Sequence, residues 1–76
     1  MKSKFFYEEE LLDAVEQGLL TEGSYDEEWQ LQYIVKDIDA YLSVEDVIYI
    51  DGYLLEVSGR QFDVSNNMAI YFVKEA

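Results

Sequence analysis

The sequence contains no cysteine and no histidine. Without cysteine, the chain has no disulfide, no thiolate metal site and no thiol nucleophile. Without histidine, it lacks the usual general base, the commonest metal ligand and the side chain whose charge ordinarily changes near neutral pH. These absences predict a protein that is not an enzyme and that carries no cofactor and no metal.

Proline is also absent, and no stretch approaches the ~20 apolar residues of a membrane span. The N-terminal MKSKFFYEEE has two lysines but no apolar run of signal-peptide length. Asp37-Ile38-Asp39 begins like a calcium loop, but Leu42 stands where that loop requires glycine. The sequence therefore predicts a soluble cytoplasmic protein without a membrane or calcium site.

Basic residues are scarce. Seventeen Asp and Glu against five Lys and Arg give a net charge of -12 over 76 residues. Half of the residues are apolar and 16% are aromatic, too many for a disordered acidic tail. We therefore expect one folded domain, residues 1–76, that holds its carboxylates on an ordered scaffold, although a core this small supplies only a few kcal/mol.

The acids are unevenly distributed, because no basic residue lies between Lys4 and Lys36. A field of one sign steers an oppositely charged partner, whereas surfaces that serve solubility usually mix signs. The predicted partner-binding surface therefore consists of the acids of this segment: Glu8, Glu9, Glu10, Asp13, Glu16, Glu22, Asp26, Glu27 and Glu28. Four further acids are expected to extend it: Asp37, Asp39, Glu56 and Asp63.

Helical periodicity dominates the first half of the chain. Leu11, Leu12 and Val15 share one stripe of a predicted helix over about 8–20. Ser24 and Glu27 have the spacing of a capping box, which predicts a second helix over about 25–42. Its expected core stripe is Leu31, Ile34, Val35, Ile38 and Leu42.

After Val44 the pattern alternates, which predicts strands over about 47–50, 53–57, 60–64 and 68–73. Asp51-Gly52 and Ser58-Gly59 are predicted two-residue turns, and Ser65-Asn66-Asn67 a third loop. The expected fold class is α+β, with two N-terminal helices packed on a three- or four-stranded antiparallel β-meander.

Two aromatic surfaces are predicted outside the main core. Trp29 and Tyr33 fall opposite the apolar stripe of the second predicted helix, and Tyr49, Leu54 and Tyr71 fall together on the second face of the predicted sheet. Either surface packs under another element of the same chain, or it binds a partner or a second copy. The short chain favours a homodimer, which would gain burial between protomers.

In size, charge, aromatic content and absence of Cys and His, the chain resembles the small acidic phage-encoded DNA-mimic inhibitors used in host takeover. It is similar above all to the inhibitor of the histone-like nucleoid protein HU. The resemblance implies a stoichiometric inhibitor that binds the DNA-binding surface of a basic protein in a bacterial host cell. It assigns no individual residue, because such mimics share charge rather than a motif.

Direct nucleic-acid binding is disfavoured, since affinity for phosphates comes from Lys and Arg. The alternative function is a non-mimic protein–protein interaction module. In that case the exposed aromatics carry the affinity, and the acidity serves solubility.

Overall fold

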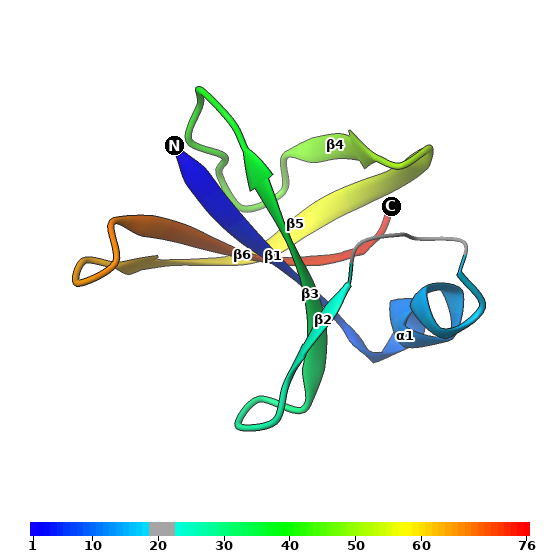
Figure 1. Ribbon diagram of the computed structural model, residues 1–76. Coiled ribbons are helices and arrows are strands. Elements are labelled where there is room, and N and C mark those ends of the chain that lie inside the picture. The colour runs from blue at the N-terminus through cyan, green and yellow to red at the C-terminus, as the bar shows by residue number, and fades with distance from the viewer. Residues whose placement is uncertain (19–22) are drawn as a thin grey trace.

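The computed structural model describes residues 1–18 and 23–76, and for Glu9 and Glu10 it describes the backbone alone. One six-stranded sheet dominates this part of the chain, in the order β2-β3-β1-β6-β5-β4 (Figure 1). The elements are β1 (Lys2–Tyr7), α1 (Glu9–Glu16), β2 (Ser24–Asp26), β3 (Leu31–Asp37), β4 (Val47–Ile50), β5 (Tyr53–Asp63) and β6 (Met68–Glu75).

The sheet is mixed. Strands β1 and β6 lie side by side in parallel at its centre, and every other neighbouring pair is antiparallel. The two-helix meander predicted from the sequence is therefore wrong. Its second half survives in part, because β4, β5 and β6 follow one another as antiparallel neighbours.

The first predicted helix is present but shorter in the described residues, as α1. Leu11 is buried, and Ala14 and Val15 pack against the same core, so the predicted apolar stripe faces inward. Asp13 and Glu16 on the other side of α1 are exposed. Residues 19–22 of the prediction lie outside the described residues.

The second predicted helix, 25–42, is wrong. The segment forms β2, a turn over 27–30 and β3, and residues 38–42 follow without helix. Tyr33, Ile34 and Val35 are aromatic or β-branched residues that suit a pleated strand. Their spacing also fits a helical stripe, because both faces of β3 carry apolar side chains and hide the alternation.

Strand β1 was not predicted, for the same reason. In KSKFFY the inward residues are Ser3, Phe5 and Tyr7, while Phe6 packs on the outer face of the sheet. An apolar residue on each face makes Phe5-Phe6-Tyr7 read as a continuous run without strand periodicity.

The Asp51-Gly52 hairpin is confirmed. Both turn residues have positive φ, 51° and 87°, as a type I′ turn requires. Ile50 pairs with Tyr53 and Ile48 with Leu55, as the sequence predicts.

Ser58-Gly59 is not a turn, so the predicted strands 53–57 and 60–64 are the single strand β5. The register shifts between Val57 and Gly59, which marks a β-bulge. Figure 1 shows β5 crossing the molecule from the β4 hairpin to the turn before β6.

The core lies on the inner face of the sheet, where α1 covers one end. Its fully buried residues include Leu55, Val57, Ala69, Tyr71 and Val73. Their neighbours Phe5, Tyr7, Ile34 and Leu11 complete the same cluster.

Candidate functional site

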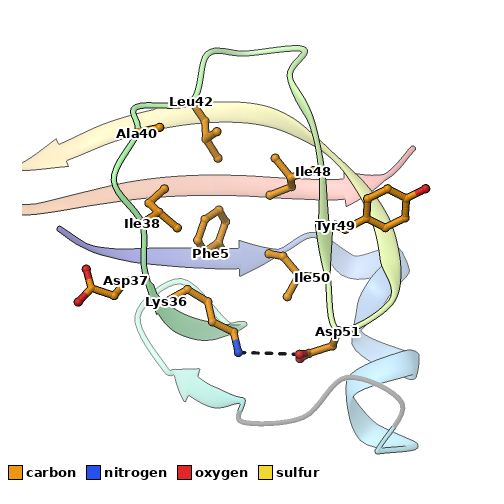
Figure 2. Close-up of a pocket in the computed structure, with 10 residues that line it drawn as sticks. All are labelled: Phe5, Lys36, Asp37, Ile38, Ala40, Leu42, Ile48, Tyr49, Ile50 and Asp51. Carbon is orange, nitrogen blue, oxygen red and sulfur yellow. Dashed lines mark ion pairs between the residues drawn. The ribbon is translucent and has the colours of Figure 1, made fainter.

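A cavity opens where the two ends of the curled sheet approach each other. The segment 38–42 that follows β3 forms one wall, and β4 forms the other (Figure 2). The cavity has a volume of about 540 Å³, within the range of ligand sites. We call it the seam cavity, and it is lined by Phe5, Lys36, Asp37, Ile38, Ala40, Leu42, Ile48, Tyr49, Ile50 and Asp51.

Hydrogen bonds fix the wall made by residues 38–42. The amide of Ile38 donates to the carbonyl of Met1 at 2.9 Å, and the amide of Leu42 donates to the Tyr71 hydroxyl at 3.0 Å. The opposite wall is fixed by the pairing of β4 with β5. Both walls of the seam cavity are therefore anchored to the sheet.

An ion pair closes one end of the seam cavity. Lys36 Nζ lies 3.8 Å from Asp51 Oδ1, and both side chains are partly exposed (Figure 2). Figure 2 also shows Ile48 and Ile50 pointing into the cavity toward Phe5, while Tyr49 points away. The interior is thus apolar, with charge at its rim.

The core beside Phe5 contains polar atoms without a hydrogen-bond partner among the described residues: Ser3 Oγ, Tyr7 Oη and Gln32 Oε1. Burial, and then the negative charge of Asp51, raise the pKa of Tyr7 above its ordinary value. Tyr7 therefore remains protonated at physiological pH.

Among the described residues, no strand pairs with the far edge of β4. Because Ile50 and Tyr53 flank a two-residue turn, they exchange both of their main-chain hydrogen bonds, and such pairs recur at every second residue. Ile48 accordingly bonds to β5, whereas the main-chain groups of Val47 and Tyr49 point away from it. The Tyr49 side chain is 75% exposed.

The predicted acidic surface divides into two groups at opposite ends of β3. Phe6 of β1 pairs with Tyr33 of β3, so α1, which follows β1, and the turn 27–30, which precedes β3, lie at the same end of the sheet. The first acidic group is therefore Glu8, Asp13, Glu16, Asp26, Glu27 and Glu28. The second acidic group lies at the other end of β3 and consists of Asp37, the last residue of the strand, and Asp39. The predicted Glu56 and Asp63 lie in β5 and belong to neither group.

Several predicted acids have local structural contacts. Asp26 Oδ1 accepts a hydrogen bond from the Trp29 amide at 3.1 Å, and Glu8 accepts one from the Ser58 hydroxyl. Glu56 lies 3.4 Å from Lys74 Nζ. By contrast, five of the predicted acids are exposed, and their side chains make no hydrogen bond or ion pair with the described residues: Asp13, Glu16, Glu27, Glu28 and Asp39.

Two of the predicted acids have lowered pKa values. Hydrogen bonds from Asn66, first from its side chain and then from its backbone, lower the pKa of Asp63. A hydrogen bond from the N-terminal ammonium group, followed by its charge, lowers the pKa of Asp37. The Asp37 side chain is exposed, and Asp63 is partly exposed. Glu22 and the side chains of Glu9 and Glu10 lie outside the described residues.

Trp29 and Tyr33 belong to an aromatic cluster on the outer face of the sheet. The Trp29 ring lies 4.8 Å from that of Phe6 and 5.2 Å from that of Phe72, and Tyr33 lies 5.2 Å from Phe6. We call these four residues the Trp29 cluster. The sequence left two alternatives for Trp29 and Tyr33, and the structure shows the first of them, packing against other residues of the same chain.

The predicted trio Tyr49, Leu54 and Tyr71 is divided. Tyr49 and Leu54 face each other across β4 and β5 and are 75% and 41% exposed. Tyr71 is completely buried, so its predicted exposure is wrong. Its register partner Phe5 belongs to the inner face. The predicted loop 65–67 was one residue too short: Asp63 pairs with Met68, so Ala69 and Tyr71, and not Met68 and Ile70, share the face of Phe62.

The sequence did not predict the seam cavity or the exposed pair of Tyr41 and Phe62, whose ring centroids lie 5.5 Å apart. The cavity wall formed by residues 38–42 had been assigned to a helix. The consecutive aromatic and β-branched residues Tyr33, Ile34 and Val35, which favour a strand, were the signal that could have corrected it.

No set of three or more acidic residues among the described positions is arranged to hold a metal ion. None of the described helical residues forms a helix long and apolar enough to cross a membrane.

The chain matches no family model, and neither the curated proteins nor the solved structures include one that is significantly similar to it.

Proposed function

We propose that the protein is a DNA-mimic inhibitor. In this proposal it binds the DNA-binding surface of a basic protein of a bacterial host, of the histone-like HU type, and blocks DNA binding there. The observation that carries the proposal is that most of the positive charge is engaged within the molecule, while many carboxylates are exposed.

Four of the five cations have intramolecular contacts. Lys36 and Lys74 pair with Asp51 and Glu56, at 3.8 and 3.4 Å. Lys4 lies 4.8 Å from the ring centroid of Tyr33, and Arg60 donates to the carbonyl of Leu42 at 3.2 Å. Acids exceed cations by twelve, so the outward field is negative.

The density of charge is comparable with that of DNA. The molecule is 32 Å long, and a duplex with one charge per ~1.7 Å carries about 19 charges over that length. The protein has seventeen carboxylates and a net charge of -12. A cationic groove shaped for DNA would therefore meet a field of similar magnitude.

The spacing of the acids also supports the proposal. The first six residues of β3, 31–36, separate the two acidic groups, which corresponds to about 20 Å of extended chain. Such groups can engage two separate sets of cations on one partner, as the two strands of a duplex do.

The test is displacement of a fluorescent DNA duplex from purified HU. We expect the protein to displace the duplex stoichiometrically and its affinity for HU to fall steeply with salt. Binding that is insensitive to salt, or that leaves the duplex on HU, would contradict the proposal.

Matched variants test whether affinity depends on the positions of the carboxylates or only on their number. One variant removes three charges of the first acidic group through Asp13→Asn, Glu27→Gln and Glu28→Gln. The control makes the same charge change outside both acidic groups through Asp46→Asn, Glu45→Gln and Glu75→Gln. We expect the first variant to lose at least about tenfold more affinity than the control, because charges that lie opposite the partner's cations contribute more to recognition than charges elsewhere. Equal losses would show that only total charge matters.

A further inference from the structure

We propose that the free edge of β4 and the seam cavity together bind an extended, basic peptide segment of a partner protein by strand addition. This inference does not rest on the proposed function, because it requires neither HU nor competition with DNA.

The main-chain groups of Val47 and Tyr49 are the first part of the site, because they point away from β5. Natural sheets usually protect such an edge with lysine, proline or a very short strand. Both edge strands are short and lack lysine and proline, but β2 reads Ser-Tyr-Asp and carries a charge, whereas the four residues of β4, Val-Ile-Tyr-Ile, are uncharged and hydrophobic. β4 is thus the edge that can pair with another strand.

The seam cavity supplies side-chain recognition. A strand added to β4 would lie about 4.8 Å from it and would direct alternate side chains toward the same face as Ile48 and Ile50. That face opens into the apolar cavity above Phe5 (Figure 2). Alternate residues of the peptide should therefore be apolar.

Charge selects a basic peptide rather than a second copy. Asp37 and Asp51 line the cavity but are paired with the N-terminal ammonium group and with Lys36. The uncompensated charge beside the edge is that of Glu45 and Asp46, which are exposed in the loop before β4. Pairing two copies through β4 would bring together two molecules of net charge -12, which repel each other. Lysine or arginine between the apolar residues of a peptide would instead be attracted to this rim.

The probe is a synthetic peptide, acetyl-Lys-Val-Lys-Phe-Lys-Val-Lys-amide, titrated into the isotopically labelled protein and followed by amide NMR shifts. We expect the largest shifts along β4 and residues 38–42. A control peptide with serine at every apolar position should bind at least about tenfold more weakly, because it has the charge without the side chains for the cavity.

Two variants at Tyr49 distinguish the contribution of main-chain hydrogen bonds to binding from that of the side chain. Tyr49→Pro removes the outward N–H without breaking the pairing of β4 with β5, whereas Tyr49→Ala removes only the side chain. We expect binding to fall about tenfold in Tyr49→Pro and to change little in Tyr49→Ala. If Tyr49→Pro does not fold, N-methylation of alternate peptide amides tests the same hydrogen bonds on the unaltered protein.

Three results would overturn the inference. The first is equal binding of the serine control peptide, with shifts spread over the acidic surface. The second is loss of binding in Tyr49→Ala together with no effect of N-methylation. The third is a homodimer in sedimentation that Tyr49→Pro dissociates, which would assign the edge to a second copy.

Discussion

The Trp29 cluster and the β4 edge are two apolar surfaces of the same sheet, but they differ in how fully the chain satisfies them. In the Trp29 cluster, a turn folds its tryptophan back over Phe6 and Phe72, so the rings cover one another. At β4, Tyr49 and Leu54 remain exposed and the main chain has no partner strand. Aromatic content alone thus does not identify a binding surface, because an aromatic residue in the middle of a sheet finds cross-strand neighbours.

The largest expected difference between the two surfaces is in stability. Phe6 is only 2% exposed and contacts three aromatic rings. We expect Phe6→Ala to lower the free energy of unfolding by about 3–5 kcal/mol, which equals the whole stability of a domain this small and leaves the variant largely unfolded. Tyr49→Ala should change it by less than about 0.5 kcal/mol. Urea denaturation of both variants measures these free energies. Equal losses of stability in the two variants would contradict the difference between the two surfaces.

Two buried tyrosines test whether the wall of the seam cavity depends on one hydroxyl. The Tyr71 hydroxyl accepts a hydrogen bond from the Leu42 amide at 3.0 Å, whereas the Tyr7 hydroxyl has no partner among the described residues. We expect Tyr71→Phe to cost about 1–2 kcal/mol and Tyr7→Phe to be neutral or stabilising. Thermal denaturation of both variants and amide exchange at Leu42 measure these effects. A greater loss of stability in Tyr7→Phe than in Tyr71→Phe would contradict the prediction.

The tight packing of the Trp29 cluster can be tested at Gly59. A Cβ there would lie 3.2 Å from Cδ2 of Phe72, and that ring is held by Trp29 and Phe6. We therefore expect Gly59→Ala to cost about 1 kcal/mol. Gly52→Ala should cost about as much for another reason, since φ is 87° there and no atom is near. If Trp29→Ala reduces the stability cost of Gly59→Ala but not that of Gly52→Ala, the packing explanation is correct. Equal costs of Gly59→Ala with and without Trp29 would contradict it.

The smallest expected effect is a pH dependence at the turn before β6. Hydrogen bonds from Asn66 lower the pKa of Asp63 in the folded protein. The stability that this gives is present above the unfolded pKa of about 3.9 and is lost as the pH falls through the folded value. We expect Asn66→Ala to raise the pKa of Asp63 in a carboxyl NMR titration. An unchanged pKa would contradict the assignment.

The sequence predicted the elements whose signals are local. The Asp51-Gly52 turn needs two residues of positive φ, and α1 has one apolar stripe against acids, so both were correctly placed. The errors fall on β1 and β3, where Phe6 and Tyr33 add an outer apolar face that hides the alternation. Their partners in the Trp29 cluster, Trp29 and Phe72, come from distant segments that no local pattern connects.

The candidate site could be predicted only as a set of residue types. The abundance of acids is visible in the sequence, but their division into two groups depends on the antiparallel pairing of β1 with β3. The seam cavity depends on the curl of the sheet, which brings Lys36 to Asp51 across fifteen positions of sequence. Tyr71 was predicted on the wrong face because the loop before β6 includes Val64, which shifts the register of β6 by one residue.

The central claim is that an ordered scaffold, and not charge alone, lets the carboxylates replace DNA on a basic protein. The most direct measurement compares the native protein with Phe6→Ala, a chain of identical charge that is expected to be largely unfolded, in displacing a duplex from HU. We predict that the native protein displaces the duplex and that the unfolded chain is at least about tenfold weaker, because its charges are not held in place. Equal displacement by the two chains would contradict the claim.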